Sequence, residues 1–393
     1  MQQFETFLFY LFGASSPLSI FAVNLTLSLL VLLFLYKIFI KKLKFEVSTI
    51  VFFLFVFTQI LSALFSDNVA SSLKGVKDFW ALSAGFLAGY SLTSETIKKF
   101  DRFKVFISIS TFLSFTMALI QLFFGTDFQK QRLFSQSGIA SMPSKGFFTH
   151  HLTFAAVMGI VFLLFLADFL IKKQTFFSYL ALFSSFFGLI LSQSRGYFLT
   201  LIVTVALLLF KNQKRFLTLF LLFSIVFSLL YLFLSPSHIK EKAYSLFSLK
   251  NGSFAERVYL WESGLTMFLR KPILGYGPNQ YQNYSDPFRE NYENKIVYPD
   301  SVGFRTKCHT HNTYLMILIE SGILGFVTFI FFLVVILKSI LSLKQEIKIP
   351  FLASFVFFLL GGVFEYNLGD AEVVSLFSFL MGLSIAVKRS NDF

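Results

Sequence analysis

The sequence predicts an all-α polytopic membrane protein. Hydrophobic residues fill 55% of the 393 positions and charged residues only 14%, against roughly 25% charged residues in an ordinary soluble domain. A soluble globule of this length would need more charge to cover its surface. The 59 Phe residues fall in long uninterrupted runs, whereas the strand of a membrane barrel alternates apolar and polar side chains. Membrane-crossing helices are therefore the expected architecture.

About twelve transmembrane helices are expected, because most apolar runs are long enough to cross roughly 30 Å of hydrocarbon. The short opening stretch 4–13 is counted as a span, since no basic residues precede it as they would in a cleaved signal peptide. The other predicted spans are 18–40, 47–65, 79–92, 105–124, 152–171, 176–191, 197–210, 216–234, 314–337, 350–364 and 373–387.

The basic residues predict how the chain is oriented. More than half of the 34 Lys and Arg residues fall in every second short loop, and these loops lie on one face of the membrane, which the positive-inside rule assigns to the cytoplasm. Both termini are then cytoplasmic, and residues 236–310 form one large external loop in a single membrane domain, 1–393. The net charge of +13 thus has a topological cause, and no nucleic-acid partner is expected. These basic residues are Lys37, Lys41, Lys42, Lys44, Lys98, Lys99, Arg102, Lys104, Lys172, Lys173, Lys211, Lys214, Arg215, Lys338, Lys344, Lys348, Lys388 and Arg389.

Arg195 is the first candidate binding residue. It lies in the polar stretch SQSRG, between two predicted spans in a short external turn. An arginine there could simply extend to the membrane interface. A basic residue in a short external turn is disfavoured, however, so we expect an anionic partner, for which a phosphate suits the guanidinium fork.

Arg257 is the second candidate, within the external loop. Ser253 and Glu256 have capping-box spacing and predict a helix that begins near Phe254 and ends at Arg270, Lys271 and Pro272. A cation in the first turn opposes the helix dipole, which again favours a nearby anion. The alternative is a surface arginine paired with a neighbouring Glu. The expected apolar face of this helix is Val258, Trp261, Leu265 and Phe268.

His311 is the candidate base, just ahead of the predicted span 314–337. A histidine can accept a proton at neutral pH. If a helix starts at His311, Tyr314 and Leu315 fall on the same face and fix the imidazole. A structural histidine that caps this helix is the alternative, as is a zinc site formed with Cys308 and His309.

Several stretches resemble the O-antigen ligase and O-antigen polymerase family of bacterial membrane glycosyltransferases. They are SQSRGYF, ERVYLW, KPILGYGPNQY, HNTYLMILIESGILG and FEYNLGDAEVVSLFSFLMGL. The resemblance implies a twelve-span C-type glycosyltransferase fold in the bacterial inner membrane. It also implies a glycan donor on undecaprenyl pyrophosphate and transfer on the periplasmic face without a metal or other cofactor.

The resemblance implies roles for individual residues. Arg195 and Arg257 would hold the donor pyrophosphate, and His311 would act on the acceptor hydroxyl. The secondary candidates are His309, Asn312, Tyr314, Glu320 and Arg270. Glu320 is singled out because an acidic residue inside a span is a functional candidate by default.

Three activities that differ in their acceptor fit these motifs. We prefer an O-antigen ligase, which delivers the glycan to the lipid A core, because the single large loop lies late in the chain. A polymerase that joins lipid-linked repeats and a protein O-oligosaccharyltransferase are the alternatives. A transporter or flippase would instead use Arg195, Glu320 and His311 along a path through the membrane.

Overall fold

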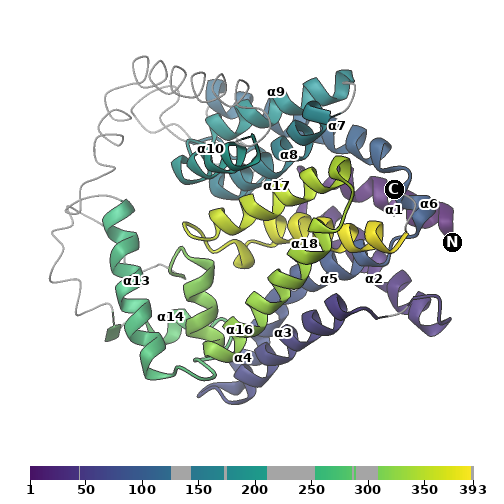
Figure 1. The fold of residues 1–393 in the computed structure, drawn as a ribbon. Helices are drawn as coiled ribbons and strands as arrows, with labels where there is room; N and C mark the ends of the chain where they lie inside the picture. The colour runs from purple at the N-terminus through teal and green to yellow at the C-terminus, as the bar shows by residue number, and fades with distance from the viewer. Residues whose placement is uncertain are drawn as a thin grey trace.

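The computed structural model describes residues 1–43, 45–124, 143–171, 175–209, 253–285, 287–288 and 309–390, and their regular secondary structure is entirely helical. The predicted all-α class is confirmed for these residues. The helices pack as a bundle, with α13 set apart at one side (Figure 1). The elements are α1 (Gln2–Ser15), α2 (Ile20–Phe39), α3 (Val47–Leu64), α4 (Val69–Val76), η1 (Lys77–Phe79), α5 (Trp80–Tyr90), α6 (Ser94–Ile97), α7 (Phe100–Phe124), α8 (His151–Ile171), α9 (Phe176–Leu191), α10 (Arg195–Leu209), α13 (Ser253–Arg270), α14 (Tyr281–Tyr284), α16 (Thr313–Leu341), α17 (Gln345–Gly361), η4 (Asn367–Gly369) and α18 (Ala371–Ser390).

Each predicted span that falls on described residues coincides with a helix, while 216–234 lies outside them. Among the described helices, α2, α3, α7, α16 and α18 are long and apolar enough to cross a membrane, and α8, α9 and α10 are apolar but shorter over their described parts. The number twelve stays a prediction. The span predicted at 105–124 begins earlier, at Phe100, because charged residues end an apolar run without ending a helix.

The pair α5 and α18 forms the centre of the bundle. Gly85 and Gly89 lie one turn apart on α5, and Gly382 lies opposite on α18. A methyl group on Gly89 would lie 2.1 Å from the carbonyl oxygen of Phe379, and one on Gly382 would lie 2.1 Å from that of Phe86. Small residues thus let the two backbones approach closely, as in membrane helix pairs.

α16 is broken at Gly322, where the sequence predicted a continuous span. Gly322 has φ 62° and ψ −165°, a conformation open to glycine. The turn after α13 enters the break: the backbone N–H of Tyr276 donates to Ile319 at 2.9 Å, and that of Ile323 donates to Pro272 at 2.8 Å. The break therefore anchors the end of α13 to α16.

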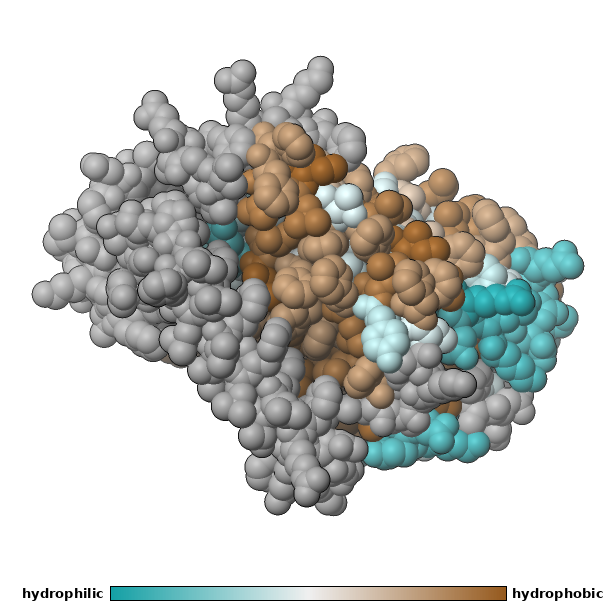
Figure 2. Space-filling view, turned by 90° about the horizontal axis from the view of Figure 1, so that it is seen from above, coloured by the Kyte–Doolittle hydropathy of each residue, from teal (hydrophilic) through white to brown (hydrophobic). Residues whose placement is uncertain are grey.

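The described surface is largely apolar. Figure 2 shows a broad hydrophobic area on one face of the molecule, and exposed side chains such as Phe21, Phe39 and Phe65 contribute to the apolar surface as a whole. An exposed apolar surface of this kind fits contact with lipid. The apolar helices and this surface indicate a multi-pass membrane protein.

Candidate functional site

The candidate site is built where the start of α16 meets the segment 361–367. Asn312 caps α16, since its Oδ1 accepts from the backbone N–H of Leu315 at 2.9 Å. The backbone N–H of Thr313 donates to Gly362 at 2.8 Å. The Thr313 hydroxyl donates to the carbonyl of Glu365 at 3.0 Å and accepts from the N–H of Asn367 at 2.9 Å. These bonds fix the two segments against each other.

The Glu365 carboxylate joins two of the predicted site residues. Its Oε1 lies 2.6 Å from Nη2 of Arg257, and its Oε2 lies 2.7 Å from Nδ1 of His311. Nε of Arg257 also donates to the carbonyl of Phe364 at 3.2 Å. All three charged or titratable side chains are largely buried, with 11% of the Glu365 side chain exposed, 22% of Arg257 and 14% of His311.

Glu365 is held as a carboxylate. Burial acts to raise its pKa, but the hydrogen bond from His311 and the charge of Arg257 outweigh burial, so the pKa of Glu365 lies below its usual value. A carboxylate can only accept, so we assign the proton of a neutral His311 to Nδ1. Nε2 is then the atom that carries a lone pair and can accept a proton.

α13 begins at Ser253 and carries Arg270 in its last turn, close to the predicted bounds, and Arg257 lies one turn after its start. The anion beside this helix start is Glu365, which lies far away in the sequence. The side chains of Ser253 and Glu256, the predicted cap, lie outside the described residues.

The apolar face predicted for α13 is correct in part: Trp261 and Phe268 pack against the buried cluster around Met267 and Leu315, but Leu265 does not. Leu265 is 51% exposed, whereas Leu260 and Met267 are fully buried. The helix is rotated because Gly264 packs against α16, where a methyl group would lie 3.0 Å from the side chain of Leu315. Trp261 is partly buried and donates to the carbonyl of Thr310 at 3.1 Å.

Arg195 begins α10 next to the same segment. Its neighbour Gly196 lies against Phe364, since a methyl group there would be 3.6 Å from Cβ of Phe364. Arg195 itself is exposed, and it lies close enough to Arg257 for the two positive charges to interact. The structure thus brings Arg195, Arg257 and His311 to the single segment 361–367.

The structure contradicts the expected setting of His311. It has φ 52° and precedes the Asn312 cap, so it lies outside α16 and shares no helix face with Tyr314. The imidazole is fixed by Glu365, and the ring of His309 lies 4.3 Å away. The hydroxyl of Tyr314 donates to Leu359 at 2.7 Å, which gives it a structural contact.

Glu320 contacts the edge of this cluster, whereas Arg270 lies apart from it. Glu320 is about 10 Å from the start of α16 at 1.5 Å per residue. Its Oε1 accepts from the backbone N–H of Asn279 at 2.9 Å, and its Oε2 accepts from the hydroxyl of Tyr366, in the segment 361–367, at 3.5 Å. Arg270 is exposed at the end of α13, about 20 Å from Arg257 along the helix by the same measure. The prediction that groups Arg270 with the site residues is therefore not supported by its position.

The expected absence of a metal or cofactor and the expected binding of pyrophosphate both remain predictions. The described residues contain no group of three or more His, Cys, Asp or Glu side chains that could hold a metal ion, while Cys308 lies outside the described residues. The absence of a metal and of any other cofactor therefore stays a prediction, as does the pyrophosphate-binding role of the two arginines.

Sequence reasoning missed Glu365 as a member of the site. The sequence did contain a signal for it, namely two polar residues just after a predicted span. Glu365 directly follows the span 350–364, and Asn367 lies two residues further on. The hydroxyl of Tyr197, next to the start of α10, lies 2.5 Å from Oδ1 of Asn367 and donates to it. Asn367 and Tyr197 therefore support the segment that carries Glu365.

Comparison with known proteins finds a family match over part of the chain. A sequence model of the O-antigen ligase family matches residues 180–330. This part of the chain is similar to the O-antigen ligase family. It contains Arg195, Arg257 and His311, and the match confirms the family resemblance of the sequence motifs.

Curated relatives also match part of the chain. A Rickettsia typhi protein, provisionally named a polysaccharide ligase, is 27% identical over 148 residues, which are 37% of this chain and 34% of that protein. A similarly named protein of Rickettsia conorii shows the same identity and coverage. An uncharacterized protein of Haemophilus influenzae is 29% identical over 181 residues, 41% of this chain and 43% of its own length. The alignments thus span about a third to two fifths of these relatives.

Proposed function

We propose that the chain is a membrane glycosyltransferase that moves a glycan from undecaprenyl pyrophosphate to an acceptor hydroxyl on the periplasmic face. Its expected activity is O-antigen ligation onto the lipid A core, in the bacterial inner membrane with both termini cytoplasmic. The observation that carries the proposal is the Glu365 carboxylate, which contacts Arg257 and His311 beside Arg195. The match to the O-antigen ligase family supports glycan transfer in general.

The donor pyrophosphate is placed against the two arginines. Arg257 is paired with Glu365 and Arg195 lies near Arg257, so these three side chains carry one net positive charge. Guanidinium groups bind phosphate oxygens through paired hydrogen bonds. An anion that settles here gains charge contacts that grow stronger as negative charge develops on the leaving group.

The transfer step is a single displacement. The acceptor oxygen forms a bond to the anomeric carbon while the bond from that carbon to the pyrophosphate oxygen breaks. Nε2 of His311 accepts the hydroxyl proton, and Glu365 stabilises the resulting imidazolium through Nδ1. The electron pair of the broken bond leaves on undecaprenyl pyrophosphate, whose charge Arg195 and Arg257 offset. The imidazolium then returns its proton to solvent.

The displacement is expected to invert the anomeric configuration. Both oxygens of Glu365 are engaged, by Arg257 and by His311, so this carboxylate is poorly placed to serve as a nucleophile. An attack opposite the leaving pyrophosphate produces inversion. Nuclear magnetic resonance of the product linkage tests this, and a retained configuration would contradict it.

A transfer assay with purified protein and lipid-linked glycan tests the function. Three acceptors are offered separately: a core lipid, a second lipid-linked repeat, and a peptide with hydroxyl side chains. Product on the core lipid alone supports the ligase, whereas product on another acceptor reassigns the activity to a polymerase or a protein glycosyltransferase. No product on any acceptor, with transport of labelled lipid-linked glycan in vesicles, would support the transporter instead.

A further inference from the structure

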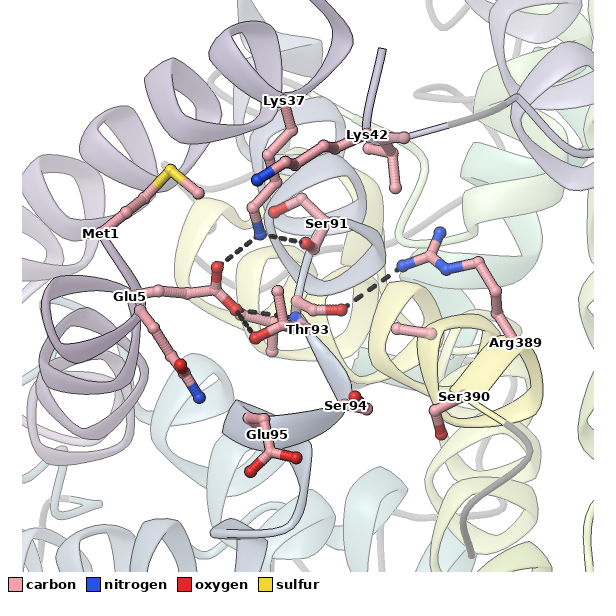
Figure 3. Close-up of a pocket in the computed structure, with 14 residues that line it drawn as sticks. Met1, Glu5, Lys37, Lys42, Ser91, Thr93, Ser94, Glu95, Arg389 and Ser390 are labelled. Carbon is pink, nitrogen blue, oxygen red and sulfur yellow. Dashed lines mark hydrogen bonds and ion pairs between the residues drawn. The ribbon is translucent and has the colours of Figure 1, made fainter. Parts of the chain in front are cut away.

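A cavity of about 520 Å³ lies at the opposite end of the bundle from the candidate site. α18 connects the two regions, because it begins after Asp370, near Glu365, and ends at Ser390 in the cavity wall. The other walls come from α1, the end of α2 and the turn 91–95 (Figure 3). Nothing in the proposed transfer reaction uses this cavity.

Its inner wall holds a buried ion pair. Lys37 and Glu5 are 3% and 1% exposed, and the ammonium group of Lys37 contacts the carboxylate of Glu5. Lys37 also donates to the carbonyl of Ser91 at 2.5 Å. Glu5 accepts from the backbone N–H and the hydroxyl of Thr93 at 2.7 and 2.8 Å. This part of the wall is therefore rigid and carries no net charge.

Two further cations line the cavity. Nη2 of Arg389 donates to the carbonyl of Tyr90 at 2.8 Å, while its Nη1 is buried and meets no acceptor among the described residues. Lys42 lies at the rim and is exposed. The other acid of the wall, Glu95, is bound by Lys98 at 3.1 Å. Lys42 and Arg389 thus leave an excess of positive charge facing the cavity.

We propose that this cavity binds the phosphate head group of an anionic membrane lipid. A guanidinium and an ammonium group that line one cavity favour an acceptor with several oxygens, and a phosphate provides them. The cavity has the volume of a small-ligand site. Both adjoining helices also carry apolar side chains that offer surface for acyl chains. Phe7 on α1 is 57% exposed, and Phe39 on α2 is 84% exposed. A free phosphate would make no use of that surface, so a lipid fits better.

The test measures the thermal stability of the full chain in a neutral detergent. Dioleoylphosphatidylglycerol, dioleoylphosphatidylcholine and inorganic phosphate are titrated separately. A ligand that binds only the folded state raises the apparent Tm, so we expect an increase with phosphatidylglycerol and little with the other two. Lys42→Glu should need at least about fivefold more phosphatidylglycerol for half of the effect.

Lys74→Glu is the matched control, because Lys74 is exposed on α4, which packs against the turn at Pro278. This variant should respond like the wild type. Arg389→Gln is a second variant, although Arg389 also holds the carbonyl of Tyr90 and its loss can weaken the fold. Lys42 is exposed, so Lys42→Glu keeps the test decisive if Arg389→Gln fails to fold.

Three results would overturn the proposal. Equal half-saturating concentrations for Lys42→Glu and the wild type would show that the cavity charge plays no part. Equal stabilisation by phosphatidylcholine would remove the selectivity for an anionic head group. A full effect from inorganic phosphate would assign the site to a soluble anion.

Discussion

Nδ1 of His311 lies 2.7 Å from Oε2 of Glu365, and the other oxygen of that carboxylate lies 2.6 Å from Nη2 of Arg257. One side chain therefore positions both the proposed base and one of the proposed phosphate ligands. Glu365 lies outside residues 180–330, the part that matches the O-antigen ligase family. The site consequently needs the helical segment that follows the matched domain, and a fragment ending at residue 330 should lack transfer activity.

Glu365→Gln is expected to lower kcat by about 10- to 100-fold, as loss of a residue that orients a reactive histidine commonly does. A carboxylate can accept from both Arg257 and His311, whereas the amide has one acceptor oxygen and one donor nitrogen. The variant therefore cannot accept from both Arg257 and Nδ1–H of His311, and it favours the imidazole tautomer whose Nε2 carries the proton. Transfer kinetics with lipid-linked glycan measure the effect.

Glu95→Gln is the control for this change, because Glu95 is an exposed glutamate at the opposite end of the bundle. It should retain the wild-type rate. If Glu365→Gln were also as active as the wild type, Glu365 would have no role in orienting the base.

Arg195→Gln is expected to raise the KM for the lipid-linked donor more than it lowers kcat. Arg195 is exposed at the start of α10, so the pyrophosphate can reach its guanidinium group from solvent. Arg257→Gln should lower kcat as well, because Arg257 also bonds Glu365 and the carbonyl of Phe364. Steady-state kinetics with varied donor separate the two effects.

Arg102→Gln provides the comparison, since Arg102 is exposed at the start of α7. Its KM and kcat should match the wild type. Identical kinetics for Arg195→Gln and Arg102→Gln would exclude Arg195 from donor binding.

Helix positions could be predicted closely from the sequence. The predicted span 176–191 has the bounds of α9, Phe176–Leu191, because apolar runs and helices end together where polar residues reach the interface. The predicted start of α13 was also within one residue. These features depend on local sequence, so they can be found without knowledge of the packing.

The arrangement of the site depended on contacts that no local pattern contains. The break at Gly322 is held by the turn at Pro272 and Tyr276, which comes much earlier in the sequence. His311 has a positive φ because its segment is bonded to residues 361–367, and local helix signals cannot predict that conformation. The partner of His311 was missed for the same reason.

Asp370→Asn is expected to remove a pH dependence of stability. Burial, followed by the charge of Glu372, raises the pKa of Asp370 from 3.8 to about 7. Between about pH 4 and 7 the folded state then binds a proton that the unfolded state lacks, so stability falls as pH rises through this range. Asn can still accept from the hydroxyl of Thr153, which donates to Asp370 at 2.5 Å.

The apparent Tm of both proteins from pH 5 to 8 measures this effect. The Tm of the wild type relative to Asp370→Asn should decrease as the pH rises toward 7. Asp101→Asn, an exposed position on α7, should keep the wild-type profile. A constant difference between Asp370→Asn and the wild type across the range would show that Asp370 does not titrate there.

Gly322→Ala is expected to destabilise the protein by roughly 2 kcal/mol or more. Gly322 has a positive φ, and an added methyl group would lie 2.2 Å from the carbonyl oxygen of Ile273. The turn after α13 would have to move away from α16, which should also displace Arg257. Gly196→Ala is the matched change, because its methyl group would meet Phe364 at an ordinary 3.6 Å. Thermal unfolding in detergent compares the two variants, and an equal, small loss of Tm in both would show that the break in α16 does not require glycine.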